Sequence, residues 1–212
     1  MARKAAAVVA LALVATACGL DKNEGLSGGG KIIGRTVTVY SILPDPARSG
    51  RDFVDGEKLA LSDANGRAGA LAVNFSSLDA GEGSDGVEAE AAHTAIRDPQ
   101  IVAAIAPATP VTVSLLNAAG ILQVASGGDL GLATDTRANP SGRRTLGRPP
   151  AERVPDDFRT RFREAFGRSP RPEAATGYQA MRGIIRAVAA ANPGNDRAKV
   201  VASYFAESPG GG

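Results

Sequence analysis

The chain of 212 residues has a single cysteine, Cys18, a single histidine, His93, and no tryptophan. A lone cysteine excludes an internal disulfide and a metal site built from several thiolates. With no second histidine or further cysteine to join it, His93 is expected on a helix surface and not in a catalytic or metal site. We therefore expect no cofactor and no metal, and a fold held together by its apolar core.

Neither sign of charge dominates the sequence. It contains 24 Lys and Arg residues against 22 Asp and Glu residues, and two of the basic residues, Arg3 and Lys4, lie among the first 17. Without those 17 residues the numbers are equal. A nucleic-acid-binding protein is expected to cluster its basic residues, and no such block occurs between residues 19 and 140. The charge balance argues against a nucleic-acid partner.

Motifs of the common enzyme classes are also missing. Outside residues 19–34 there is no nucleophile elbow, no histidine pair and no glycine-rich dinucleotide loop after the first predicted strand. Residues 25–31 match part of a nucleophile elbow and part of a phosphate loop. They lack a preceding strand, and Ile32 stands where a phosphate loop requires Ser or Thr. We predict that the protein is not an enzyme.

The first 17 residues have the pattern of an export signal. A basic pair is followed by an apolar run at residues 5–15 and by small residues before Cys18. The run is shorter than the roughly 20 residues that a transmembrane helix needs. The pattern resembles a bacterial lipoprotein signal, although Ala15 stands where Leu is usual. We predict a signal peptide at residues 1–17, lipid attachment at Cys18 and a flexible tether at residues 18–35, with an ordinary secretory signal as the alternative.

Residues 101–128 predict a strand, a short helix and a second strand. The runs at residues 101–106 and 121–125 are short, uncharged and rich in apolar residues, as strands covered by helices on both faces are. The helix between them is expected to end at Gly120. In open parallel sheets, ligands bind just outside the carboxyl ends of the strands. The loops at residues 107–110 and 126–128 are therefore the candidate site.

Strand and helix patterns alternate through the first part of the chain. Strands are predicted at residues 36–43 and 71–78, and helices at residues 50–65 and 88–97. Later helices are predicted from Asp156 or Asp157 to Gly167, at residues 173–192 and at residues 197–207. The alternation indicates an α/β fold with a doubly wound, Rossmann-like, mostly parallel sheet and helices on both faces.

Several short motifs occur in the order found in one protein family. They are Leu43-Pro44, Gly50, Gly56, Leu59-Ala60-Leu61, Asn65-Gly66, Asp98, residues 101–107, residues 119–124, residues 139–145, Phe162, Phe166-Gly167, Pro170, Gly177-Tyr178 and Ala180-Met181. Through them the chain resembles the first lobe of type 1 periplasmic (solute) binding proteins, in particular the leucine/isoleucine/valine-binding family of branched-chain amino acid ABC transporters. Residues 139–145 resemble the segment that crosses to the second lobe.

The resemblance implies two lobes with the ligand in a cleft between them. Here only about ten residues separate the crossing segment from a helix that resembles the one returning to the first lobe. Most of the second lobe is therefore expected to be missing. We predict a first-lobe domain at residues 36–147, a bridge at residues 148–155, returning helices of the same domain at residues 156–207, and a disordered tail at residues 208–212.

The resemblance also implies a ligand site at the ends of two strands. The candidate ligand-binding residues are Ala108, Thr109, Ala125, Ser126 and Gly127. The hydroxyls and the N–H groups of residues 126–128 can bind an anion, whereas Pro110 removes one donor. As an alternative, Thr109 and Ser126 are turn and cap residues only. A lone lobe would leave about half of a ligand in water, since pockets normally bury roughly 70 to 90% of one.

The expected function is that of an extracytoplasmic solute-binding lipoprotein, truncated, and weak or partner-dependent in binding. Its ligand would be an amino acid or amide, its partner an ABC transporter permease, and its place the outer face of the bacterial cell membrane, held through the lipid anchor, or the periplasm. Two alternatives stay open. One is an exported, lipid-anchored interaction or sensing module without a small-molecule ligand, and the other is a degenerate receptor remnant.

Overall fold

The computed structural model describes residues 30–207, except residues 49, 83 and 193. The predicted signal peptide, the lipid-attachment residue Cys18 and the predicted tail lie outside these residues. Within the described part of the chain, no helix is long and apolar enough to span a membrane. No group of three or more potential ligand side chains among those residues is placed to hold a metal ion.

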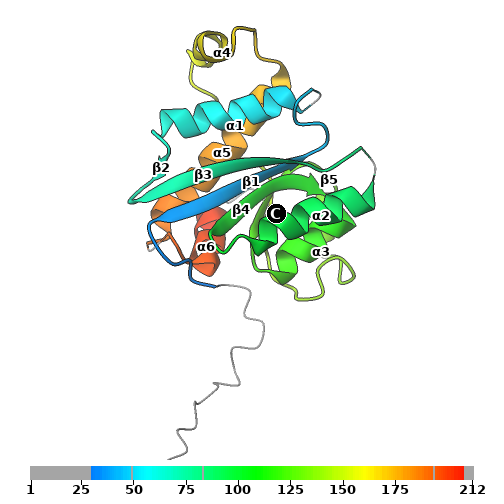
Figure 1. The fold of residues 1–212 in the computed structure, drawn as a ribbon. Coiled ribbons are helices and arrows are strands. Elements are labelled where there is room, and N and C mark those ends of the chain that lie inside the picture. The colour runs from blue at the N-terminus through cyan, green and yellow to red at the C-terminus, as the bar shows by residue number, and fades with distance from the viewer. Residues whose placement is uncertain (1–29, 49, 83, 193, 208–212) are drawn as a thin grey trace, which may run out of the picture.

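A six-stranded sheet runs through the domain in the order β2-β3-β1-β4-β5-β6 (Figure 1). Its strands are β1 (Thr36–Leu43), β2 (Arg67–Ala68), β3 (Leu71–Asp79), β4 (Ile101–Ala108), β5 (Leu122–Gly128) and β6 (Leu146–Gly147). β2 pairs antiparallel with β3, and the other neighbouring strands are parallel. The chain winds outward from the central β1 in both directions, which is the doubly wound arrangement that the sequence predicts.

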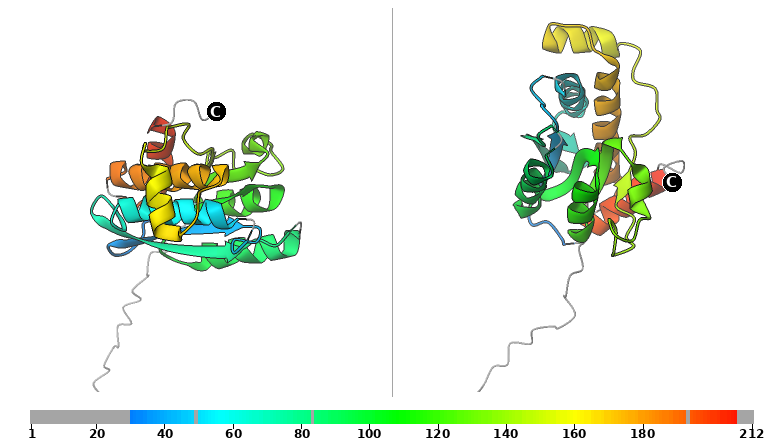
Figure 2. Two further views of the ribbon diagram at one scale, coloured as in Figure 1. Left: turned by 90° about the horizontal axis from the view of Figure 1, so that it is seen from above. Right: turned by 90° about the vertical axis from the view of Figure 1, so that its right-hand side faces the viewer.

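Helices cover both faces of the sheet (Figures 1 and 2). The apolar side chains of α1 (Arg51–Asp63), α4 (Phe158–Phe166), α5 (Pro172–Ala190) and α6 (Arg197–Glu207) join one core, and those of α2 (Asp85–Arg97) and α3 (Pro110–Ala118) join a second core across the sheet. A short 3-10 helix, η1 (Leu130–Ala133), follows β5. The predicted elements are all present. α2 begins three residues before its predicted start, and the predicted loops at residues 107–108 and 126–128 are the last residues of β4 and β5.

The alternation of apolar residues in β1 explains how the two cores form. Val37 and Val39 point toward α1 and α5, whereas Ile42 points toward α2 and α3. In β4 the first six residues are all fully buried. A strand with helices on both faces has no solvent-facing side, so a continuous apolar run is stable there.

α1 and α5 approach each other closely at two glycines. A Cβ atom on Gly177 would lie 2.1 Å from the carbonyl oxygen of Phe53, and one on Gly56 would lie 2.0 Å from that of Ala174. These distances leave no space for any side chain. Glycine at both positions therefore sets the separation of the two helices.

The segment from β6 to α4 runs along α5 and α6. A Cβ on Gly183 of α5 would lie 2.8 Å from the ring of Pro150, and Arg186 pairs with Glu152 at 2.5 Å. Tyr204 of α6 donates a hydrogen bond of 2.7 Å to the carbonyl oxygen of Arg148. The bridge predicted at residues 148–155 thus lies against the helices, and the core beneath stays closed, with Met181 and Ile184 fully buried.

Candidate functional site

The carboxyl ends of β4 and β5 lie side by side. Ala106 pairs with Ala125, and Ala108 pairs with Gly128. Gly128 has a φ of +92°, and a Cβ there would lie 2.4 Å from the carbonyl oxygen of Ala108, so this register requires glycine. The backbone N–H of Asp129 donates to the same carbonyl at 3.0 Å. The two segments predicted from the sequence as the candidate site are therefore adjacent.

Thr109 is the N-cap residue of α3, and its hydroxyl has two partners. Thr109 Oγ1 accepts a hydrogen bond of 3.2 Å from the backbone N–H of Thr112 and donates one of 2.9 Å to Glu88 Oε1. Pro110 occupies the first position of the helix, where an N–H would have no partner within the helix, so the missing donor costs α3 nothing. Thr109 is thus a cap residue. Its hydroxyl can donate to a ligand only if the hydrogen bond to Glu88 is shared with that ligand or given up.

Buried polar side chains fix the backbone next to Thr109. The carbonyl oxygen of Pro107 accepts hydrogen bonds from Gln123 Nε2 at 2.9 Å and from Thr112 Oγ1 at 2.5 Å. Gln123 also donates to Thr112 Oγ1 at 3.1 Å. An unpaired buried polar group costs about 1–3 kcal/mol. These three hydrogen bonds therefore hold the turn at residues 107–109 in one position.

The other predicted site residues differ in exposure. The side chains of Ala108 and Ala125 are buried in an apolar cluster beside η1, so these two residues offer only backbone atoms. Ser126 is half-buried and Gly127 is exposed. β6 pairs only with residues 123 and 124, so no strand in the described part of the chain covers the outer side of residues 126–128.

A cavity of about 190 Å³ lies at the same edge of the sheet, between the ends of β1, β3 and β4 and the start of α2. We call it the edge cavity. Its lining residues are Pro44, Ala80, Gly81, Ser84, Asp85, Glu88, Pro107 and Thr109. It lies where the winding of the sheet reverses between β1 and β4, which is where doubly wound folds bind ligands. Of the predicted site residues only Thr109 lines it.

Glu88 also lines the edge cavity, although the sequence pattern did not single it out. It is only 7% exposed. Burial raises the pKa of its carboxyl group, the hydrogen bond from Thr109 lowers it, and the charge of Asp85 raises it. A buried carboxylate with hydroxyl groups beside it suits a small cation such as an ammonium group. Its position was visible in the sequence, because Glu88 lies one helical turn before Ala91 and Ala92 on the apolar stripe of α2.

Solved structures of solute-binding proteins share this fold. A putative branched-chain amino acid ABC transporter protein of Rhodospirillum rubrum gives a TM-score of 0.62 at 12% identity, over 81% of this chain and 89% of its own. An ABC transporter substrate-binding protein of Desulfitobacterium hafniense, in complex with Leu, gives the same values. A leucine binding protein of Thermotoga maritima gives a TM-score of 0.59 at 14% identity, over 79% of this chain and 87% of its own. The fold is that of one lobe of a type 1 periplasmic binding protein.

The match to these periplasmic binding proteins is a match of structure. No protein-family model matches the sequence, and no curated protein matches it either. The edge cavity is lined by residues that begin, end or follow elements between β1 and α3, and α4, α5 and α6 contribute none of them. The C-terminal helices therefore leave the candidate site open.

Proposed function

We propose that this protein is an extracytoplasmic solute-binding protein of the branched-chain amino acid type, with an amino acid or amide as its ligand. The observation that carries the proposal is the edge cavity, where Glu88 and Thr109 meet at the carboxyl edge of a sheet with the periplasmic-binding-protein fold. The ammonium group of an amino acid would bind Glu88 and Thr109. Its carboxylate would lie outside the edge cavity and face the N–H groups of residues 126–128. Binding, and not catalysis, is the activity that this arrangement supports.

Binding by this lobe alone is expected to be weak. The edge cavity, at about 190 Å³, is smaller than the roughly 300–1,000 Å³ of typical ligand pockets. A ligand there would keep about half of its surface in water. Losing half of the contacts, at about 1 kcal/mol per hydrogen bond and more for charged groups, turns a micromolar site into a millimolar one. A partner that covers the edge, such as a transporter permease, would restore affinity.

The proposal includes anchoring of the protein at the membrane. A lipid on Cys18 would hold the domain at the outer face of the membrane, and residues 18–35 would act as a tether. The domain boundaries at residues 147, 155 and 207 and the absence of a second lobe belong to the same proposal. They rest on the resemblance in motif order, and the path of residues 148–155 along α5 agrees with a short bridge.

Leucine, isoleucine or valine is expected to stabilise the purified mature chain against heat. A ligand at ten times its Kd adds about 1.4 kcal/mol to the free energy of unfolding, which raises the Tm of a domain of this size by about 3 to 5 °C. A thermal-shift panel at about 10 mM of each amino acid, with amides and urea included, tests this for a millimolar site. If no compound raises the Tm and the chain dimerises as its concentration increases, the interaction module is the better assignment.

Glu88→Gln is expected to weaken amino acid binding about tenfold, because the amide keeps the hydrogen bond from Thr109 but carries no charge for the ammonium group. Glu90→Gln is the matched control, since Glu90 is exposed on the same helix. Titration calorimetry gives the Kd of each variant. Because the pKa of Glu88 is raised, binding by the unmodified chain should weaken as the pH falls through that pKa, and binding by Glu88→Gln should not. Equal Kd values for the two variants would place the ammonium group elsewhere.

A further inference from the structure

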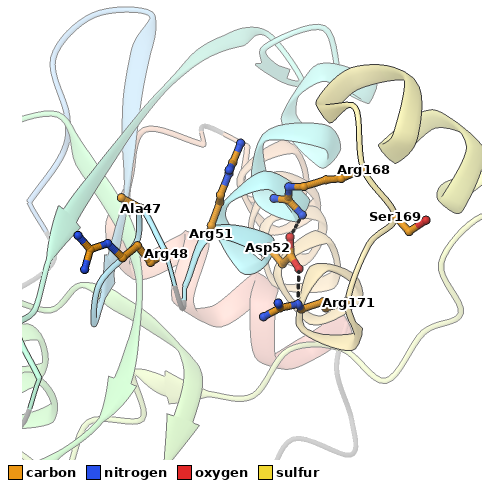
Figure 3. Close-up of a pocket in the computed structure, with 7 residues that line it drawn as sticks. All are labelled: Ala47, Arg48, Arg51, Asp52, Arg168, Ser169 and Arg171. Carbon is orange, nitrogen blue, oxygen red and sulfur yellow. Dashed lines mark ion pairs between the residues drawn. The ribbon is translucent and has the colours of Figure 1, made fainter.

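A second pocket, of about 450 Å³, lies between the start of α1 and the turn that joins α4 to α5. We call it the arginine pocket. Figure 3 shows the side chains that line it, which include Arg48, Arg51, Asp52, Arg168, Ser169 and Arg171. It shares no lining residue with the edge cavity. A site here would therefore be separate from the proposed amino acid site.

Two nearly buried carboxylates neutralise part of the positive charge of the arginine pocket. Arg168 forms ion pairs with both, contacting Asp52 through one nitrogen and Asp55 through the other, the latter at 2.5 Å. Arg171 lies 3.6 Å from Asp52, and Arg51 lies 3.8 Å from Asp55. The side chains of the two aspartates are 10% and 8% exposed. The shortest contact of each carboxylate is thus with Arg168, and the contacts with Arg171 and Arg51 are longer.

Positive charge remains in excess after this pairing. Three arginines contact the two aspartates, a fourth, Arg48, lines the same pocket, and Lys58 lies 3.6 Å from Asp55 as well. Among the described residues, no carboxylate lies within ion-pair distance of Arg48. The pKa of Arg168 is lowered, first by burial and then by repulsion from Arg51 and Arg171. The arginines therefore repel one another, and an additional anion would relieve that repulsion.

The N-terminus of α1 adds donors to the same pocket. Its N-cap residue is Gly50, which has no side chain to accept a hydrogen bond from the helix. The N–H of Arg51 donates to the carbonyl oxygen of Arg48 at 3.3 Å. The N–H groups of the next two residues have no partner within the helix, and the helix dipole favours an anion at this end. Arg51 and Asp52 are the first two residues of α1 and both line the pocket. Backbone donors and guanidinium groups thus meet at one place.

We propose that the arginine pocket binds a phosphate group, either inorganic phosphate or a phosphomonoester. Guanidinium groups form paired hydrogen bonds with phosphate oxygens, and a dianion matches the excess of at least two positive charges. The phosphate group could belong to a soluble molecule or to the headgroup of a membrane lipid. Arg48 is exposed and belongs to no ion pair in the described part of the chain. Its substitution therefore tests anion binding without breaking the ion pairs that fasten the turn before α5 to α1.

The first test is titration with inorganic phosphate and with glycerol phosphate up to about 10 mM. Arg48→Gln is expected to raise the Kd about tenfold, because one charged hydrogen-bond donor is lost and no ion pair is broken. Arg159→Gln is the control, with the same change in charge on an exposed position of α4, and it should leave the Kd within about twofold at moderate salt. A thermal melt of each variant verifies that it is folded.

The second test identifies the source of the phosphate group. The unlipidated chain is mixed with vesicles of phosphatidylcholine, with and without phosphatidic acid, whose headgroup is a phosphomonoester, and the vesicles are floated. Recovery of the unmodified chain and Arg159→Gln with anionic vesicles, but not Arg48→Gln, assigns the pocket to a lipid headgroup. Saturable binding of phosphate or glycerol phosphate without vesicle binding assigns it to a soluble ligand. No binding in either test, or equal effects of the two substitutions, overturns the proposal.

Discussion

Gly177→Ala is expected to lower the free energy of unfolding by about 3 kcal/mol, because overpacking a tight contact typically costs about 1–3 kcal/mol and this contact leaves no room at all. The new methyl group would lie 2.1 Å from the carbonyl oxygen of Phe53 and 2.9 Å from the ring of the same residue. Backbone atoms cannot rotate away as a side chain can, so α1 and α5 would have to move apart. Alanine is the better helix former by about 1 kcal/mol, and the loss of packing outweighs that gain.

Urea denaturation of three variants tests this contact. Gly86→Ala is the matched control, because a Cβ on Gly86 of α2 meets no atom within 4 Å; it should stabilise the chain by up to about 1 kcal/mol. Gly56→Ala should destabilise about as much as Gly177→Ala. In the double variant the second substitution should cost less than it does alone, since both separate the same pair of helices. If Gly177→Ala leaves the free energy of unfolding unchanged, α1 and α5 do not make this close contact.

The free energy of unfolding of the unmodified chain is expected to fall as the pH rises, and Glu57→Gln is expected to abolish that fall. Glu57 is fully buried, accepts a hydrogen bond of 3.0 Å from Ser41, and its second carboxyl oxygen has no hydrogen-bond partner among the described residues. Burial raises the pKa of this carboxyl well above its ordinary value, although Ser41 and Lys58 lower it. The folded chain therefore keeps a proton that the unfolded chain has lost.

This pKa difference fixes the sign of the pH dependence. The contribution of Glu57 to stability is complete below the pKa of the unfolded chain and is lost as the pH rises toward the pKa of the folded chain, by about 1.4 kcal/mol per pH unit. Glutamine does not titrate, so the Glu57→Gln variant should match the unmodified chain in acid and exceed it increasingly toward alkaline pH. Urea melts from pH 5 to about pH 9 measure this difference. Parallel curves for Glu57→Gln and the unmodified chain would contradict it, and the exposed Glu90→Gln should show no such divergence.

The sequence predicted the elements of this fold because their signals are local. The uncharged run of β4, the glycine that ends α4 and the apolar stripes of the later helices each lie within about a dozen residues. Gly167 does end α4, with a left-handed φ of 70°. Asp157 occupies the predicted N-cap position, but its side chain makes no capping hydrogen bond there. The identity of a cap residue was thus easier to predict than its bonding.

The candidate site was predicted only in part, because its geometry depends on contacts between distant segments. The sequence selected the ends of β4 and β5, which are adjacent. It did not show that Thr109 would donate to Glu88, 21 residues earlier. Glu57 and Glu88 share one overlooked signal, an acidic residue on the apolar stripe of a helix. A buried acidic residue of this kind is either paired with a hydrogen-bond donor or protonated, and in both cases its pKa differs from that of an exposed carboxyl group.

The arginine pocket had no signal of its own in the sequence. Arg48 and Arg51 lie at the start of α1, and Arg168 and Arg171 lie about 120 residues later along the chain. Arginine is common on surfaces, so neither pair is informative by itself. Only the packing of α5 against α1 brings the two pairs together, and only the structure shows that two aspartates are too few to neutralise them.

The two glycines that set the distance between α1 and α5 also determine how the arginine pocket can respond to an occupant. One wall of that pocket is the first turn of α1, and the opposite wall leads into the first turn of α5. Backbones in direct contact cannot slide or hinge without breaking the core, so the walls are preorganised. An incoming anion would have to order the exposed side chains of Arg51 and Arg171, but it would spend none of its binding free energy on moving the two helices together.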